Sequence, residues 1–285
     1  MSKLRLKQAF LPTVLIVLLF VMLKKCSFHS LPNERLSVVQ VEIDESYADD
    51  EYQLILKNTM SCPMRFLLSC QDVEVNELLS AITPVLLEAK TDTSINIKGK
   101  GDLKGKIEIR VKWGNPELPI LSNKIERLPY PKGKSYKLLQ GNNSKPTHNS
   151  RLSRYAFDFT LNTGDTITSS QNGYVVAVVD GYKGWGKSAK WKPFGNQIII
   201  YDTLSHLFTM YGHLKHNGSF VETGEYVTIG QAIALSGKTG QTSEEHLHFN
   251  VLRAVEEKSG LKSYPLDSIG NYKVKELKRN QRMKN

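Results

Sequence analysis

Cysteine is scarce in this chain of 285 residues, which contains only Cys26, Cys62 and Cys70. No two of them have the Cys-x-x-Cys spacing of a structural zinc site, so the sequence argues against a site of that kind. Cys62 and Cys70 are close in sequence. In an exported chain this proximity predicts a local disulfide, and two buried thiols in an apolar segment are the alternative.

Motifs for nucleic-acid recognition are also absent, since the sequence has neither a recognition-helix pattern nor basic strands interleaved with aromatic residues. This absence matters because the net charge is +10, and a basic surface attracts polyanions of several kinds. We therefore expect no nucleic-acid partner. Anionic lipid and anionic wall polymers remain as partners for the positive charge.

The chain has one long apolar run, AFLPTVLIVLLFVML from Ala9 to Leu23, and no small-x-small cleavage site follows it. Basic residues flank the run on both sides, namely Lys3, Arg5, Lys7, Lys24 and Lys25. Such a segment is typical of a secretory signal or a short membrane anchor. Because the cleavage site is missing, we expect residues 1–30 to be an uncleaved signal anchor in the inner membrane. The positive-inside rule then places the rest of the chain in the periplasm or elsewhere outside the cytoplasm.

Residues 31–126 contain stretches of alternating hydrophobicity that predict half-buried strands, among them YQLILKN, SINIKG and KIEIRVKW. The stretch VNELLSAITPVLLEAK has helical spacing at its start, but Pro84 interrupts it, so two strands around a turn are equally compatible. We expect a small β-sandwich that serves as an accessory domain.

Residues 127–263 contain short strands separated by glycine turns, as in GNQIIIYDT and LFTMYGHL, which predicts an all-β barrel or sandwich. The insertion YKGWGKSAKWKPF is basic and carries Trp185 and Trp191. It is expected either to rim a binding groove or to be a flexible surface loop. Residues 264–285 are expected to form a basic C-terminal tail, either solvated or in contact with an anionic envelope.

Several residues of the second domain could bind a metal ion. His246 and His248 lie two apart in a predicted strand, so their side chains project from the same face. Asp158 lies inside the apolar strand YAFDF, where a carboxylate is costly unless it is paired or binds a cation. His148 precedes it in a polar loop, and His213 ends an apolar strand. Two imidazoles and one carboxylate would make a three-ligand zinc site with an open fourth position, and two further histidines could handle protons.

The second domain resembles the lysostaphin/LytM-type peptidoglycan metalloendopeptidases. The similarity covers roughly half the chain, and its segments come in the family's order: His148 followed by YAFDF, then TGDTITSSQNGYVVAVVDG, GNQIIIYD, YGHL, VETGEYVTIGQ, SGKTG and HLHFNV. The resemblance implies a LytM-type β-barrel or sandwich fold. It also implies a bound Zn²⁺ and hydrolysis of peptide bonds in peptidoglycan stems or cross-bridges.

The resemblance also implies a role for each candidate residue. His148, Asp158 and His248 correspond to the metal ligands, and His213 and His246 correspond to the catalytic histidines. The commonest family pattern places the first histidine four residues before the aspartate, whereas ten residues separate His148 from Asp158 here. A subgroup with a longer loop has this arrangement.

Two other functions remain as alternatives. A non-catalytic wall-binding regulator could share the fold, but such relatives have usually lost one or more of the five residues, and all five are present here. A carrier module resembling the sugar phosphocarrier proteins fits an exported chain with this set of residues poorly. The sequence carries no indication of an oligomeric state.

Overall fold

The computed structural model describes residues 30–36, 39–145 and 147–285. The chain divides into two compact units, Met1–Leu31 and Pro32–Asn285, and the fold described below belongs to the second. The expected signal anchor falls almost entirely outside the described residues. Among the residues that the structure does describe, no helix has the length and apolar character needed to cross a membrane.

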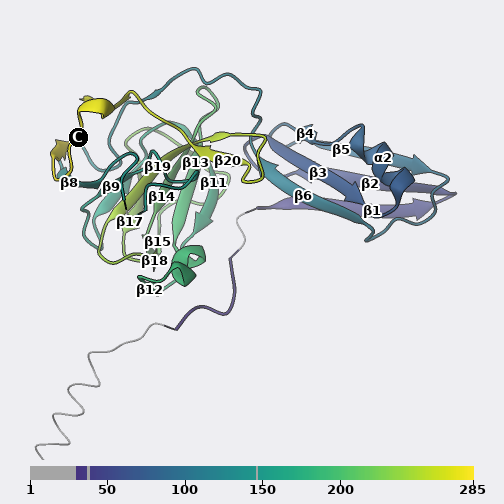
Figure 1. Ribbon diagram of the computed structural model, residues 1–285, viewed down its shortest axis with the longest axis horizontal. Coiled ribbons are helices and arrows are strands. Elements are labelled where there is room, and N and C mark those ends of the chain that lie inside the picture. The colour runs from purple at the N-terminus through teal and green to yellow at the C-terminus, as the bar shows by residue number, and fades with distance from the viewer. Residues whose placement is uncertain (1–29, 37–38, 146) are drawn as a thin grey trace, which may run out of the picture. The chain divides into compact units, whose positions relative to one another are not determined.

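The N-terminal lobe (residues 41–113) consists of two three-stranded antiparallel sheets and one short helix (Figure 1). One sheet has the order β1 (Val41–Ala48), β2 (Glu51–Asn58) and β5 (Asp92–Lys98). The other has the order β4 (Val85–Leu87), β3 (Met64–Cys70) and β6 (Ile107–Trp113). Alternate residues of β2 and β3, such as Leu54 and Phe66, are buried in one shared core, as the period of two in a strand requires.

The ambiguous stretch around Pro84 is a helix followed by one strand, and not two strands around a turn. Its first half is helix α2 (Val73–Ser80), which begins where the Asp72 side chain accepts a hydrogen bond from the backbone N–H of Val75. Its second half, after Pro84, is strand β4. The helical spacing therefore predicts only the residues that precede the proline.

The expected disulfide is wrong, because Cys62 and Cys70 are both free thiols. Strand β3 (Met64–Cys70) carries the chain straight away from Cys62. A strand rises about 3.3 Å per residue, so the two ends of β3, Met64 and Cys70, lie about 20 Å apart, whereas a disulfide needs Cα atoms about 4.4–6.8 Å apart. The alternative of thiols in an apolar segment describes Cys62, which is buried in the lobe's core.

The C-terminal lobe (residues 124–285) is built on a nine-stranded sheet that faces a three-stranded sheet. The large sheet contains β16 (Tyr226–Val227), β11 (Gly173–Val179), β13 (Gln197–Tyr201), β14 (Phe208–Gly212), β19 (Leu247–Ala254), β9 (Phe157–Phe159), β8 (Ser135–Gln140) and β23 (Arg282–Lys284) in this order, with β20 (Leu261–Ser263) paired to β19. The small sheet contains β10 (Thr166–Thr168), β17 (Ala232–Ser236) and β15 (Leu214–Ser219). Both sheets contribute to one core, which includes Ile233 and Phe249. The all-β prediction is confirmed.

Residues 264–285 are part of this fold and do not form a solvated tail. Strand β21 (Ser268–Ile269) pairs with β22 (Tyr272–Lys273) and with β7 (Lys124–Ile125), and β23 pairs with β8. A single 3₁₀ turn, η2 (Val274–Glu276), lies between β22 and β23. The side chains of Ile269 and Met283 are fully buried in the core, which fixes the segment despite its many lysines. The domain boundaries given above stay a prediction.

The two lobes share buried contacts. The rings of Trp113 and Phe208 stack with their centroids 6.1 Å apart. The buried Arg65 guanidinium donates hydrogen bonds to the backbone carbonyls of Val255, Trp113 and Gly260 at 3.1 to 3.2 Å. The turn between β19 and β20 is thereby attached to the N-terminal lobe.

Candidate metal centre and active site

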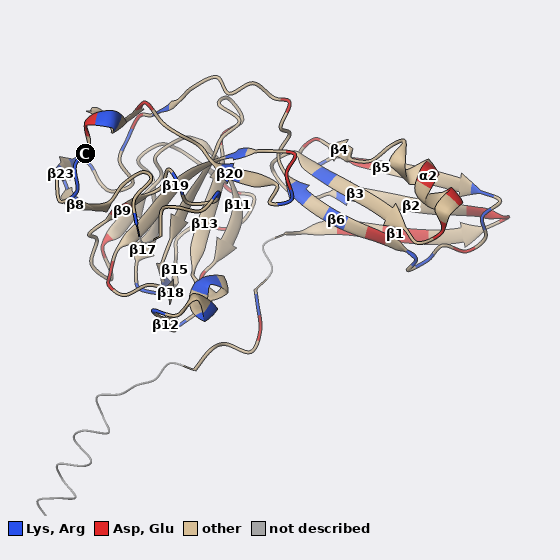
Figure 2. Cartoon of the chain, in the orientation of Figure 1, with Lys and Arg blue, Asp and Glu red and all other residues tan. Residues whose placement is uncertain are grey.

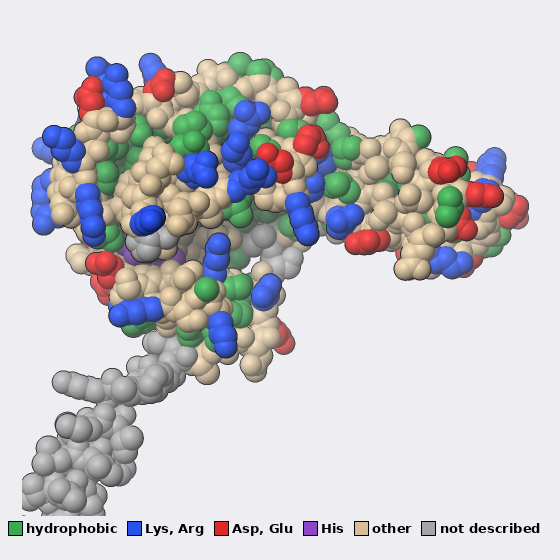
Figure 3. All heavy atoms as spheres, in the orientation of Figure 1, with side chains coloured by type: hydrophobic (Ala, Val, Ile, Leu, Met, Phe, Trp, Pro, Cys, Tyr) green, Lys and Arg blue, Asp and Glu red, His purple; other side chains and the backbone are tan. Residues whose placement is uncertain are grey.

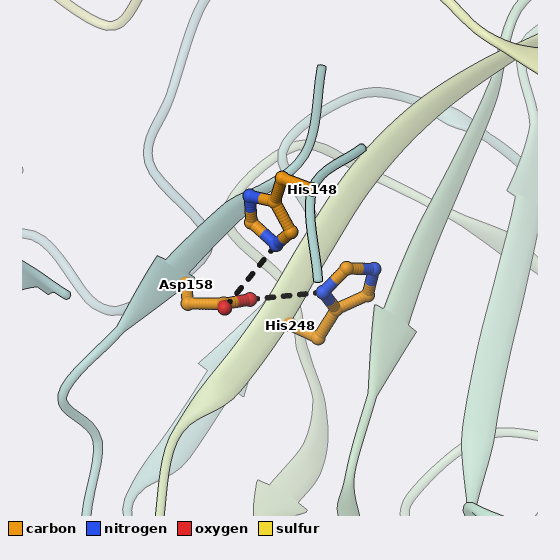
Figure 4. A group of neighbouring side chains, drawn as sticks. All are labelled: His148, Asp158 and His248. Carbon is orange, nitrogen blue, oxygen red and sulfur yellow. Dashed lines mark hydrogen bonds and ion pairs between the residues drawn. The ribbon is translucent and has the colours of Figure 1, made fainter. Parts of the chain in front are cut away.

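Asp158 and His248 lie on neighbouring strands at the centre of the candidate site. Strand β9 pairs with β19 so that Asp158 is directly opposite His248. The His248 Nδ1 atom lies 2.9 Å from Asp158 Oδ1, within hydrogen-bonding distance (Figure 4). The apolar neighbours of both residues, Phe157, Phe159, Leu247 and Phe249, point into the core and hold the two strands in this register.

His148 reaches the same carboxylate from the long loop between β8 and β9. Its imidazole is fully buried, and its Nε2 atom lies 3.2 Å from Asp158 Oδ2. Its Nδ1 atom donates a hydrogen bond to the backbone carbonyl of Gly141 at 2.9 Å. This bond fixes the neutral tautomer, which leaves the Nε2 lone pair directed toward the carboxylate.

The surroundings of His148 Nε2 fit a cation. This buried atom lies 3.2 Å from the Asp158 Oδ2 atom, so a proton or a cation must stand between the nitrogen lone pair and the carboxylate oxygen. Burial acts to lower the pKa of His148, but the adjacent Asp158 carboxylate outweighs that effect, so the pKa is raised. A proton between the two groups is favoured in the protein without metal, and a metal ion could take the same place.

The three residues have the donor atoms of a catalytic zinc site. One ligand atom from each of His148, Asp158 and His248 lies within 4.8 Å of the others. Zinc bonds of about 2.0–2.1 Å in a tetrahedron place neighbouring ligands about 3.3 Å apart, close to the distances from Asp158 to the two imidazoles. Two nitrogens and one carboxylate leave a fourth position open, as hydrolysis requires.

Asp158 remains ionised in this buried place. Burial acts to raise the pKa of its carboxyl group, but hydrogen bonds from His148 and His248 outweigh burial and lower the pKa below its ordinary value. The carboxylate is therefore available as a ligand without first losing a proton.

His213 and His246 lie next to these ligands. The centroids of their rings are 4.6 Å apart, and His246 Nε2 lies 3.8 Å from Asp158 Oδ1. His213 Nδ1 donates to the carbonyl of Thr239 at 2.7 Å, and His246 Nδ1 donates to the carbonyl of Glu244 at 3.0 Å. In the neutral imidazoles each Nε2 atom is therefore a proton acceptor.

The charge of His213 is set by its surroundings. Burial, together with the nearby imidazoles of His246 and His248, lowers the pKa of His213 to about 3. Its side chain is consequently neutral throughout the range in which most enzymes work, and its Nε2 lone pair is available.

Two buried polar residues that the sequence patterns did not indicate support His213. Asn196 is fully buried, and its side chain exchanges hydrogen bonds of 2.8 and 2.9 Å with the backbone of Tyr182. Its backbone N–H donates to the Thr239 hydroxyl at 3.0 Å, and that hydroxyl donates to the carbonyl of Leu214 at 2.8 Å. The backbone at His213 has a φ of +62°, and these bonds hold the chain on either side of it. A polar residue directly before the apolar strand QIIIY is the one signal that could have indicated Asn196.

The basic insertion is an ordered wall beside the histidines. Its strand β12 (Trp185–Gly186) pairs with β18 (Gly240–Gln241), and its 3₁₀ turn η1 (Ala189–Phe194) follows. The rings of Tyr182, Trp191 and Phe194 form a small core of their own. Figure 3 shows a cleft in this lobe with histidine side chains on its floor and Lys and Arg side chains on both sides. The structure thus brings all five predicted site residues together, while their roles stay a prediction.

Comparison with known proteins identifies the domain that carries the site. The model of peptidase family M23 matches residues 153–260, which include Asp158, His213, His246 and His248 but not His148. The C-terminal lobe therefore contains a peptidase M23 domain.

Two characterised proteins are homologous over this domain. Lysostaphin of Staphylococcus simulans is 34% identical over 96 residues, 33% of this chain and 17% of that protein. The peptidoglycan DD-endopeptidase ShyB of Vibrio cholerae is 30% identical over 136 residues, 46% of this chain and 29% of that protein. The chain thus matches less than a third of the length of either relative.

Two solved structures are also similar. The catalytic domain of lysostaphin from Staphylococcus simulans has 23% identity and a TM-score of 0.32, covering 46% of this chain and 87% of that one. A zinc-containing peptidase from Vibrio cholerae has 18% identity and a TM-score of 0.34, covering 74% of this chain and 82% of that one.

Proposed function

We propose that this chain is a zinc-dependent endopeptidase that hydrolyses peptide bonds in the stems or cross-bridges of peptidoglycan. The observation that carries the proposal is the convergence of His148, Asp158 and His248 beside two further histidines whose Nδ1 atoms are held by backbone carbonyls. Homology of the M23 domain to ShyB, a peptidoglycan DD-endopeptidase, supports the choice of substrate.

The side chains of His148, Asp158 and His248 would hold the metal. Bound zinc would supply Lewis-acid activation of a water molecule and of the scissile carbonyl group. His148 keeps its position through its bond to Gly141, and His248 keeps its position through the strand pairing. The three ligands would therefore need little rearrangement on metal binding.

His213 and His246 would move protons at their Nε2 atoms, because their Nδ1 atoms are held by backbone carbonyls. One of them accepts the proton of the attacking water, and the other donates a hydrogen bond to the developing oxyanion or to the leaving amine. His213, with a pKa of about 3, favours the neutral form.

We also propose that the protein works outside the cytoplasm, in the cell envelope, attached to the membrane by residues 1–30. The support is the composition of that segment, a single apolar run between basic residues. Its location can be tested by protease accessibility in intact and permeabilised cells. Degradation only after the inner membrane is opened would contradict this part of the proposal.

The enzymatic proposal is tested with full-length protein purified in mild detergent. His248→Ala should lose bound zinc and release no peptides from purified sacculi, because a ligand is gone. His246→Ala should keep most of its zinc and still release almost none. Zinc content is measured by mass spectrometry, and products by chromatography.

Two outcomes would decide against hydrolysis at this site. Equal digestion by wild type and both variants would place the activity elsewhere. Stoichiometric zinc without any released peptide would favour the alternative, a wall-binding regulator on the same fold.

A further inference from the structure

Two chain segments beside the site carry positive charge only. Residues 141–155 contain Lys145, Arg151 and Arg154 and no acidic residue, a charge of +3. Residues 182–194 contain four lysines and no acidic residue, a charge of +4 out of a net +10 for the whole chain. Figure 2 shows the second segment as blue ribbon at η1.

These segments lie on two sides of the site. Residues 141–155 carry His148, whose imidazole contacts Asp158. Residues 182–194 are attached to the segment that holds the catalytic pair, because Trp185 pairs with Gly240 and the neighbouring Thr239 carbonyl binds His213. One basic segment thus belongs to the metal side, and the other belongs to the side of the catalytic histidines.

The lysines of the second segment have a rigid base. Gly186 lies against the Trp191 ring so closely that a Cβ atom would not fit. The Lys238 ammonium lies 3.7 Å from the centroid of the Trp185 ring, which joins the two paired segments a second time. Positive charge is consequently held at a fixed place on the groove wall.

Three lysines of the second segment are exposed and have no acidic partner. Lys187, Lys190 and Lys192 are all exposed to solvent and form no ion pair within the described part of the chain. On the other wall Arg151 is paired with Glu257 at 2.9 Å, while Lys145 and Arg154 are exposed. A ligand between the walls meets mainly positive charge.

Acidic residues also occur beside the catalytic histidines, namely Asp158, 3.8 Å from His246, and the neighbouring Glu244 and Glu245. Glu244 and Glu245 directly precede His246, and Glu245 accepts a hydrogen bond from the backbone N–H of Thr163 at 3.0 Å. A polymer with negative charge along its whole length would be repelled there. A short peptide with carboxylates at particular positions can avoid that place and still lie along the lysines.

We propose that this groove selects peptides that carry free carboxylates near the scissile bond, as peptidoglycan stem peptides do, over neutral peptides such as oligoglycine bridges. The inference rests on the proposed endopeptidase function and narrows its substrate class. Lys187, Lys190 and Lys192 are the specificity-determining residues. Each exposed charge near a carboxylate should change affinity roughly two- to threefold, so the three together give about tenfold.

The probes are two fluorescent peptides of one sequence, L-Ala-γ-D-Glu-L-Lys-D-Ala-D-Ala, with its carboxylates either free or amidated. Their binding to full-length, zinc-loaded His246→Ala protein is measured by anisotropy at low and high salt, so that cleavage does not interfere. The free acid should bind about tenfold more tightly, and high salt should remove most of the difference.

The matched variants carry three Lys→Gln substitutions each. Lys187→Gln, Lys190→Gln and Lys192→Gln together should reduce the preference to less than about threefold. Lys104→Gln, Lys258→Gln and Lys275→Gln together remove the same charge from exposed positions elsewhere and should leave it unchanged. Thermal unfolding of both triple variants should match that of the parent protein.

Equal binding of the two peptides, or a preference that survives in the groove variant, would overturn the inference. Tighter binding of a linear polyphosphate than of the acidic peptide would also overturn it, since the groove would then be a general polyanion site. If wild type cleaves neither peptide nor sacculi but the preference is found, the carboxylate site stands and the endopeptidase proposal fails.

Discussion

Asp158 accepts a hydrogen bond from His248 across two paired strands, with Nδ1 2.9 Å from Oδ1, and contacts His148 with its other oxygen. Asp158→Asn keeps the shape of the side chain but removes the charge that a cation needs. We expect zinc affinity to fall by at least about 100-fold, more than the 10–100-fold typical of residues that only support a ligand. Competition with a chromophoric chelator measures the change. An affinity within threefold of wild type would show that Asp158 is not a ligand.

The lowered pKa of His213 predicts a pH dependence of stability. Between about pH 3 and 6.5 the unfolded chain binds a proton at this residue that the folded chain does not, so stability falls as the pH drops through this window. His148, with its raised pKa, stabilises the folded chain fully below about pH 6.5 and loses this contribution only as the pH rises above that value. His213→Gln removes only the first effect.

Urea unfolding in the presence of a chelator, from pH 6.5 down to 4, measures this difference. The wild-type free energy of unfolding should decline more steeply than that of His213→Gln, by up to about 1.4 kcal/mol per pH unit. Identical slopes would mean that His213 is protonated as easily in the folded as in the unfolded protein.

Thr239 should be a positioning residue for His213. Thr239→Val leaves the Leu214 carbonyl and the Asn196 backbone N–H without their hydroxyl partner, which should cost about 2–3 kcal/mol of stability. The rate constant kcat should fall while KM changes little, because the imidazole is displaced but the groove remains. Thr239→Ser keeps the hydroxyl and should restore kcat. Failure of serine to do so would exclude this role.

Arg65 should contribute to stability far more than an exposed arginine. Arg65→Met removes the guanidinium donor from the carbonyls of Trp113, Val255 and Gly260, of which Gly260 keeps a bond from the Val255 backbone N–H, and we expect a loss of about 2–4 kcal/mol in chemical denaturation. Arg110, which is exposed and 3.6 Å from Glu108, is the control, and Arg110→Met should cost less than about 1 kcal/mol. Equal losses would contradict the importance of the buried contacts.

Local patterns in the sequence predict those parts of the site that lie within a single strand. The spacing of His246 and His248 places them on one face of β19, and a carboxylate in YAFDF indicates a paired Asp158. His148 could be assigned only through the family resemblance, because a loop of sixteen residues has no fixed geometry. Asn196 and Thr239 were missed since they are 43 residues apart and meet only in the folded chain.

The wrong expectations have similar physical reasons. The disulfide was inferred from a short sequence separation, but an extended strand makes that separation a long distance. The tail was inferred from its lysines, whereas two buried apolar side chains, Ile269 and Met283, determine where the segment lies. A few fully buried contacts outweigh many solvated charges.

The hydrophobic core of the N-terminal lobe includes residues of the peptidase domain, among them Ile199, Phe208 and Leu252. A fragment that begins at residue 127 would expose these hydrophobic side chains to water. Such a fragment would be prone to aggregation during purification. An isolated domain engineered from this chain should therefore keep both lobes, or carry polar substitutions at the exposed hydrophobic positions.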